Sequence, residues 1–191
     1  MPTILWLMKS YEYIALLGTL TWMTVPFFQF KSKHFIFFIL IGLNDFIGLI
    51  FYYSSISSQS LWIPILYLTV LGLEKDFFIK NLKWIFSGLI LVFMLNHYSS
   101  PLIQHLFSLL TSTIILIVFT WYFYMDYINN IISKYYIILS IYGLFSVYQS
   151  TLLISKVELD LNIYFVAMTI KILIGVILIF IKKDYQFSTK G

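Results

Sequence analysis

Long apolar stretches separated by short polar segments run along almost the whole chain. Most of them approach the roughly 17 to 25 residues that a helix needs to cross the hydrocarbon core of a bilayer. Because lipid offers backbone groups no hydrogen-bond partner, such stretches are expected to be helices. The pattern therefore predicts an all-α polytopic membrane helix bundle, a single integral membrane domain over residues 1–191. The seven predicted transmembrane helices cover residues 13–30, 35–53, 61–79, 84–98, 102–125, 135–154 and 162–181.

The third and fourth predicted spans are the least regular of the seven. The third is apolar only from Leu61 to Leu73, and charged residues follow directly. If these two spans formed a re-entrant hairpin, the count would fall to five. We prefer seven, with the third helix continuing through its charged end into the interface.

The lysines indicate an orientation for this bundle. All 12 basic residues are lysines, and seven spans leave only Lys9 and Lys156 outside, with Lys171 inside the membrane. Because positive residues concentrate in cytoplasmic loops, the N-terminus is predicted to lie outside and the C-terminus in the cytoplasm. The lysines on the predicted cytoplasmic side are Lys31, Lys33, Lys75, Lys80, Lys83, Lys134, Lys182, Lys183 and Lys190.

Composition agrees with a membrane protein. Hydrophobic residues make up 61% of the chain and charged residues 10%, with a mean hydropathy of +0.93, whereas soluble domains average about 25% charged residues. The absence of cysteine excludes disulfides, thiolate metal sites and cysteine nucleophiles. The net charge of +4 follows from the loop lysines, so we expect the lipid bilayer as a partner and no nucleic acid.

Two opposite charges interrupt predicted spans near their middle. Lys171 lies about 13 Å and Asp45 about 12 Å from the outer ends of their helices, at 1.5 Å per residue. A buried charge in a membrane is costly unless it has a partner, so an ion pair between them is expected. The pair has two interpretations: it fixes helix register, or it binds a proton, an anion or a polar substrate. A third possibility is that Lys171 extends to the interface.

Small residues suggest which way these charges point. Gly42 and Gly48 flank Asp45 at three-residue spacing, and Ala167 and Gly175 flank Lys171 at four. Small residues on one stripe of a membrane helix mark close approach of another helix. Both charges are therefore predicted to face the bundle interior.

Other polar residues cluster in the same half of the predicted membrane. Together they are predicted either to line a cavity that opens to the outside or to form interhelical hydrogen bonds. The candidate binding residues beside Asp45 and Lys171 are Asn44, Gln104, His105, Ser108 and Gln149, with Thr111, Ser112 and Ser146 on the same faces.

The remaining titratable residues are predicted to lie at the interfaces. His34 is expected at the inner edge, and His97 and His105 near an outer loop, with no metal-ligand spacing among them. Neither a metal nor a cofactor is predicted. Glu74 and Asp76 are expected in a solvated, self-paired cytoplasmic loop, with a partner-docking surface as the alternative.

The first three and last three predicted spans have the same orientation, which suggests a 3+1+3 parallel repeat. Aligning Lys33 with Lys134 places Gly42 on Gly143. Parallel repeats occur in transporters. Because the chain uses few residue types, chance identity explains such matches equally well.

Two resemblances follow from these patterns. The 3+1+3 order resembles the SWEET and PQ-loop transporter architecture, although Phe27 stands where that family's Pro-Gln signature, here Val25-Pro26-Phe27, has its glutamine. The runs LNDFIGLIFYY and SLWIPILYLTVLGLE resemble a group of small, uncharacterised seven-helix bacterial inner-membrane proteins. Members of that group tend to carry carboxylates where Asp45 and Glu74 stand. The resemblance implies a bacterial inner (cytoplasmic) membrane location and no known activity.

Three functions fit the sequence. The first is a small-solute or ion transporter with a polar site near the bilayer midplane, binding a small polar or anionic ligand. The second is a non-enzymatic signalling or accessory subunit that binds a membrane protein partner or forms a homo-oligomer. The third, a membrane enzyme, is disfavoured because the chain lacks a metalloprotease motif and a glycine-rich phosphate loop.

Overall fold

The computed structural model describes residues 2–54, 61–155 and 161–181. Within these ranges the chain forms eight α-helices and no strand, so the all-α prediction is confirmed. The helices are α1 (Pro2–Phe28), α2 (Phe35–Ser54), α3 (Trp62–Leu71), α4 (Lys75–Lys80), α5 (Leu82–Tyr98), α6 (Pro101–Ile128), α7 (Lys134–Ile154) and α8 (Leu161–Phe180).

The predicted single helix over 61–79 is divided into α3 and α4, and in this respect the prediction was wrong. The break at Gly72 is fastened to the link between α1 and α2. The backbone N–H of Lys75 donates to the carbonyl of Lys33 at 2.8 Å, and the His34 ring bonds to the carbonyl of Leu73 through Nδ1. These tertiary bonds satisfy backbone groups that a continuous helix would have paired internally.

One helix in the described part of the chain, α6 with 28 residues, is long and apolar enough to cross a membrane by length and composition. Shorter apolar segments occur in α2, α5 and α8, at Phe35–Phe51, Leu82–Tyr98 and Phe165–Phe180. At ten residues, α3 is about 15 Å long.

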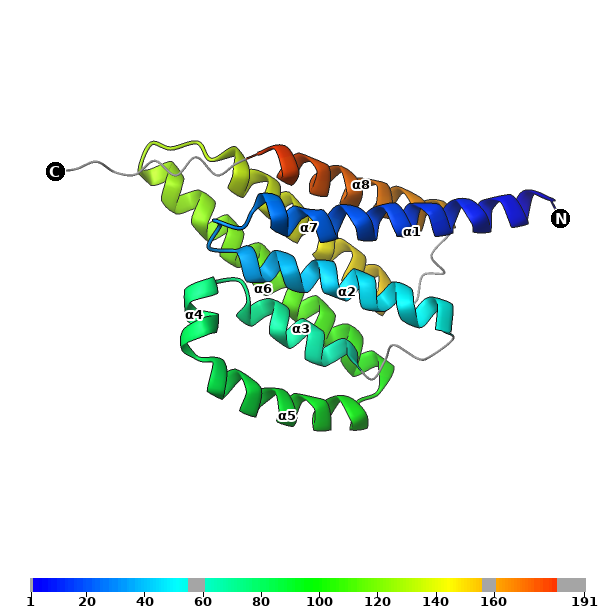
Figure 1. The fold of residues 1–191 in the computed structure, drawn as a ribbon, viewed down its shortest axis with the longest axis horizontal. Helices are drawn as coiled ribbons and strands as arrows, with labels where there is room; N and C mark the ends of the chain where they lie inside the picture. The colour runs from blue at the N-terminus through cyan, green and yellow to red at the C-terminus, as the bar shows by residue number, and fades with distance from the viewer. Residues whose placement is uncertain (1, 55–60, 156–160, 182–191) are drawn as a thin grey trace.

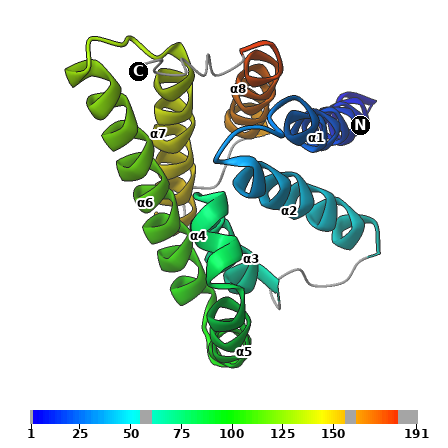
Figure 2. The ribbon, with the colours of Figure 1, turned by 60° about the vertical axis from the view of Figure 1, so that its left-hand side comes forward.

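Six helices form a ring in which neighbours pack in the order α1, α2, α3, α6, α7, α8 and back to α1. Figure 2 shows α6 and α7 on one side of this ring and α1, α2 and α8 on the other. The helix α5 lies outside the ring against α3 (Figure 1). There the Asn96 side chain accepts a hydrogen bond from the backbone N–H of Ile63, at the start of α3.

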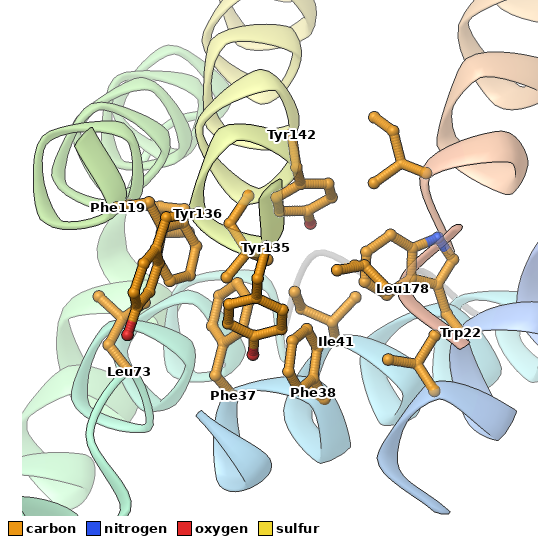
Figure 3. Close-up of a cluster of buried hydrophobic side chains, with 14 residues drawn as sticks. Trp22, Phe37, Phe38, Ile41, Leu73, Phe119, Tyr135, Tyr136, Tyr142 and Leu178 are labelled. Atoms are coloured by element: carbon orange, nitrogen blue, oxygen red, sulfur yellow. The ribbon is translucent and has the colours of Figure 1, made fainter. Parts of the chain in front are cut away.

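The main hydrophobic core lies at one end of the ring. Its members come from the second halves of α1, α6 and α8, from the first halves of α2 and α7, and from Leu73 between α3 and α4. These segments meet toward the end where the chain passes from α1 to α2 (Figures 1 and 3). Phe37, Phe119 and Leu139 are fully buried there. We call this end, where α4 and the beginnings of α2, α5 and α7 also lie, the lysine end. Its described lysines are Lys31, Lys33, Lys75, Lys80, Lys83 and Lys134.

Polar contacts connect the helices at the lysine end. The Gln29 amide donates to the carbonyls of Leu178 at 2.6 Å and Ile181 at 2.8 Å, which ties α1 to α8. The hydroxyls of Ser32 and Tyr135 bond at 2.9 Å. The Lys33 ammonium lies 3.1 Å from the ring centre of Tyr122 on α6, a cation–π contact.

In the other half of the ring, α2 is less buried than at the lysine end. None of the side chains that the structure describes in α2 beyond Gly42 is buried, whereas Phe37, Phe38 and Ile41 before it are. We call this half, which holds Thr19, Asp45, Ser108, Ser112, Ser150 and Lys171, the polar half. Within the described residues of α2, buried side chains are thus confined to the part next to the lysine end.

Candidate functional site

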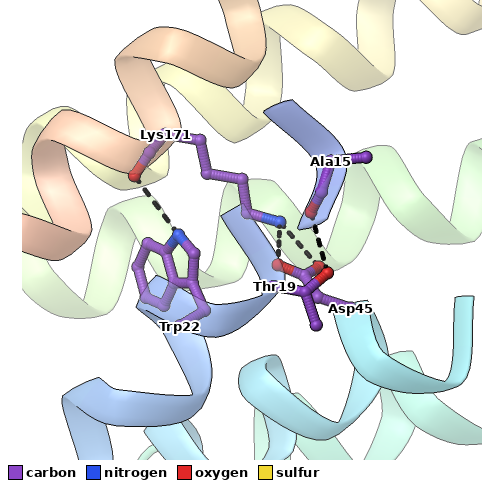
Figure 4. A network of polar contacts seen from close by, with 5 residues as sticks. All are labelled: Ala15, Thr19, Trp22, Asp45 and Lys171. Carbon is purple, nitrogen blue, oxygen red and sulfur yellow. Dashed lines mark hydrogen bonds and ion pairs between the residues drawn. The ribbon is translucent and has the colours of Figure 1, made fainter. Parts of the chain in front are cut away.

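The candidate site is an ion pair between the middles of α2 and α8. Lys171 Nζ lies 2.7 Å from Oδ1 and 2.7 Å from Oδ2 of Asp45 (Figure 4). Each residue stands near the midpoint of a 20-residue helix, and the two helices run in opposite directions, so their midpoints meet at one depth (Figure 1). The ion pair expected from the sequence is confirmed.

The pair is shielded but not sealed. The Lys171 side chain is 16% exposed and that of Asp45 12% exposed. A carboxylate and an ammonium at this burial lose much of their hydration, and their mutual bidentate contact compensates for it. Because each side chain keeps some exposed surface, the carboxylate and the ammonium are within reach of a small ligand or a proton.

The helix α1 lies between α2 and α8 and supplies the surroundings of the pair. The Trp22 indole N–H donates to the backbone carbonyl of Lys171 at 3.2 Å, and Lys171 Nζ lies 5.9 Å from the Trp22 ring centre. Thr19, buried and bonded to the carbonyl of Ala15 at 3.0 Å, lies next to the Asp45 carboxylate (Figure 4).

Tyr142 of α7 completes the surroundings from the opposite wall of the ring. Its ring centre is 5.0 Å from that of Trp22. The site therefore joins residues of four helices, α1, α2, α7 and α8, and combines one anion, one cation and two aromatic rings.

Small residues bring these helices together, as predicted at three of four positions. A Cβ on Gly42 would lie 2.8 Å from the carbonyl oxygen of Trp22, and one on Gly175 would lie 2.7 Å from the Thr21 methyl carbon. Ala167 is buried. The prediction for Gly48 was wrong: this glycine is exposed, and a Cβ on it would have no heavy atom within 4 Å. At about 3.6 residues per turn, Gly48 lies on a different face of α2 from Gly42.

The polar stripe on α6 packs against α7. The Ser150 hydroxyl bonds to those of Ser108 at 3.0 Å and Ser112 at 3.2 Å. Gln104 donates to the hydroxyl of Ser99 at 3.4 Å. Of the two interpretations of the stripe, interhelical hydrogen bonding therefore accounts for Ser108 and Ser112.

The structure does not join the other predicted binding residues to the ion pair. Asn44 and Gln149 are half-buried, and neither forms a side-chain hydrogen bond within the described ranges. His105 is half-buried, with its Nδ1 atom shielded from solvent. Glu74 and Asp76 are exposed at the start of α4, and neither is ion-paired within the part of the chain that the structure describes.

The prediction that His34 is a solvated interface residue was wrong. The ring is fully buried and packs among the rings of the lysine end. Its centre lies 5.2 Å from that of Phe119 and 5.8 Å from that of Tyr136. The sequence places it at the end of an apolar stretch, but the turn before α2 directs it inward. Among the described residues no group of three or more His, Cys, Asp or Glu side chains gathers as a metal site would require.

Three residues of the site were not foreseen from the sequence. Trp22 lies inside an apolar stretch and not at its end, where interfacial tryptophans are common, and this position is the signal that sets it apart. Thr19 and Tyr142 carry no comparable signal, because both side chains are frequent throughout the chain.

Comparison of the chain with protein-family models, curated proteins and solved structures finds no match.

Proposed function

We propose that the chain is a multi-pass membrane protein that binds and moves a small polar or ionic solute at the Asp45–Lys171 pair, near the middle of the bilayer. The observation that carries this proposal is the position of the pair. It lies near the middle of two apolar 20-residue helices, beside the hydrophobic core of the lysine end. Intramembrane charges of this kind mark solute and ion pathways in membrane proteins.

The molecular surface supports a lipid environment. Large apolar side chains are exposed on several helices, with Trp84 at 78%, Ile90 at 66% and Phe180 at 81%. A soluble monomer rarely exposes contiguous apolar patches larger than a few hundred Å². In lipid the same side chains need no further cover.

The helix order supports seven crossings with the N-terminus outside. In this arrangement α3 and α4 form the third crossing together, and α4 lies at the cytoplasmic interface. The described lysines of the lysine end then face the cytoplasm, in agreement with the positive-inside rule. The polar half opens toward the outside.

Burial in α2 and α7 supports the 3+1+3 repeat. At Gly42 a side chain would meet the backbone of α1, and at Gly143 it would lie 2.7 Å from Leu116 Cα of α6. Each repeat would thus pack its first two helices through one glycine. Under the alignment of Lys33 with Lys134, the positions buried in both helices are His34 and Tyr135, Phe38 and Leu139, Ile41 and Tyr142, and Gly42 and Gly143.

The proposal is tested in proteoliposomes. Purified protein is reconstituted, and entry of protons (by an enclosed pH dye), labelled glucose, acetate and glycine is measured. We expect at least one of these to enter faster than into protein-free liposomes, and Asp45→Asn and Lys171→Met to abolish the excess. The control Asp126→Asn removes a carboxylate at the lysine end and keeps the flux. Absence of flux for the whole panel, or full flux in Asp45→Asn, contradicts the proposal.

A second candidate, an accessory subunit that binds another membrane protein, is favoured by one observation. The helix α5 packs only on α3 and α4 among the described elements with substantial contacts, and it exposes Trp84, Phe86, Ile90 and Met94. This candidate predicts that a stoichiometric membrane protein partner copurifies in mild detergent. It further predicts that Ile90→Ser in α5 releases the partner while Asp45→Asn does not.

A further inference from the structure

We propose that the Asp45–Lys171 site takes a zwitterion carrying a primary ammonium and a carboxylate, such as a small amino acid. This inference rests on the proposed function, because it names the solute class of the same site. It is carried by the geometry around Lys171 Nζ and by the charges that a ligand would have to replace.

Lys171 Nζ occupies a preformed binding site for an ammonium group. Both oxygens of Asp45 accept from it at 2.7 Å, and the Trp22 ring centre lies 5.9 Å away. A carboxylate beside an aromatic face is the arrangement that binds ammonium groups. The protein's own ammonium fills this position, so a ligand ammonium of the same chemistry can compete for it.

Lys171 is the member of the pair that can withdraw. Its ammonium stands on a flexible four-carbon stem, whereas the Asp45 carboxylate stands close to the backbone of α2. Displacement of Nζ by a few ångströms therefore requires no movement of α8. The Trp22 bond to the Lys171 backbone carbonyl can persist during that movement.

Charge balance then selects the ligand. A lone cation bound to Asp45 would leave Lys171 unpaired, and a lone anion bound to Lys171 would leave Asp45 unpaired. An unpaired buried charge is strongly unfavourable. Tyr142 lies beside Trp22, with ring centres 5.0 Å apart, and a phenol supplies neither an ammonium nor a carboxylate in place of a lost partner. A zwitterion gives each charge a new partner and leaves the site neutral.

In this proposal the ligand reaches the pair from the polar half. Beyond Gly42 no described side chain of α2 is buried, whereas Phe38, Tyr142 and Leu178 close the core toward the lysine end (Figure 3). A ligand that enters from the polar half would meet the ion pair before it meets this core.

The experiment measures binding by thermal stabilisation of the detergent-solubilised full chain. The zwitterionic probes are glycine, L-alanine and L-leucine, and the matched half-ligands are methylammonium and acetate, alone and mixed. We expect saturable stabilisation by at least one zwitterion, with each half-ligand about a hundredfold weaker or more, because each lacks one charged partner.

Variants separate this inference from a structural effect. Asp45→Asn and Lys171→Gln should each abolish the stabilisation, while the controls Asp126→Asn and Lys134→Gln retain it. Because a single change leaves one charge unpaired and can impair folding, the double variant Asp45→Asn/Lys171→Gln is included. It should fold and bind no zwitterion.

The outcomes distinguish this inference from the proposed function. If acetate or methylammonium alone binds as tightly as glycine, or no zwitterion stabilises the chain, the zwitterion inference is overturned, while flux of protons or another solute in proteoliposomes would still support the proposed function. Binding of zwitterions that survives in the double variant overturns the role of the pair in both.

Discussion

The two halves of the ring hold their helices together by different means. At the lysine end, aromatic and aliphatic side chains from five helices and from Leu73 pack together, and Gln29, Ser32 and His34 add bonds between neighbouring elements. In the polar half, the contacts across the ring are the Asp45–Lys171 pair and the hydroxyls around Ser150. The ion pair therefore lies between an end whose helices are held by a hydrophobic core and a half whose helices are held by few polar contacts.

The largest difference in the loss of unfolding free energy is expected between alanine substitutions at two phenylalanines of α6. Phe119 is fully buried at the lysine end, and Phe107 is 37% exposed in the opposite half. Phe119→Ala should lower the free energy of unfolding by about 3 to 5 kcal/mol, through lost packing and a cavity. Phe107→Ala should cost about 1 kcal/mol or less. Denaturant titration in detergent measures both, and equal losses would contradict the difference in packing.

Breaking the ion pair should have the next largest effect. Asp45→Asn or Lys171→Met leaves one buried charge without its partner, and each should lower stability by about 3 kcal/mol. Asp45→Leu combined with Lys171→Met should restore most of that loss, because no charge remains. If the double variant is as unstable as the single ones, the pair is not coupled. Solute binding should stay absent in the double variant.

Gly42 and Gly48 allow a matched pair of alanine substitutions within α2. Gly42→Ala should destabilise by about 1 to 3 kcal/mol, because its Cβ would lie 2.8 Å from a backbone oxygen of α1. Gly48→Ala, in open space, should be neutral or stabilise the helix by up to about 1 kcal/mol. Thermal unfolding of the two variants tests which face of α2 packs on α1, and a loss of stability at Gly48 would contradict its place in open space.

The smallest effect is expected for the hydroxyl cluster. Ser150→Ala removes the bonds to Ser108 and Ser112, and at about 0.6 kcal/mol per interhelical bond the loss should be about 1 kcal/mol. Thr151→Ala serves as the control, because its hydroxyl bonds within its own helix. A loss of several kcal/mol in Ser150→Ala would mean that the polar half depends on these hydroxyls more than on the ion pair.

The sequence predicted the helical class and the ion pair for physical reasons that act locally. Apolar length specifies a helix, and two charges at equal depth in apolar helices require each other. The break between α3 and α4, the burial of His34 and the exposure of Gly48 depend on bonds and distances between distant segments. The break, for example, is held by bonds of Lys75 and Leu73 to Lys33 and His34, which lie in a separate part of the chain. Spacing along one helix contains no information of that kind.

We infer that, in the conformation of this structure, water reaches the ion pair from the polar half and not from the lysine end. The chain has no cysteine. Single cysteines can therefore replace two serines, because the two side chains are similar in size. Ser146 is half-buried one turn beyond Tyr142 on α7, and Ser32 is buried at the lysine end. In sealed vesicles of known orientation, a membrane-impermeant thiol reagent is applied to each side in turn. We predict that Ser146→Cys is labelled from the N-terminal side only and that Ser32→Cys is protected from that side. Labelling of Ser146→Cys from the lysine side, or from neither side, would contradict the account.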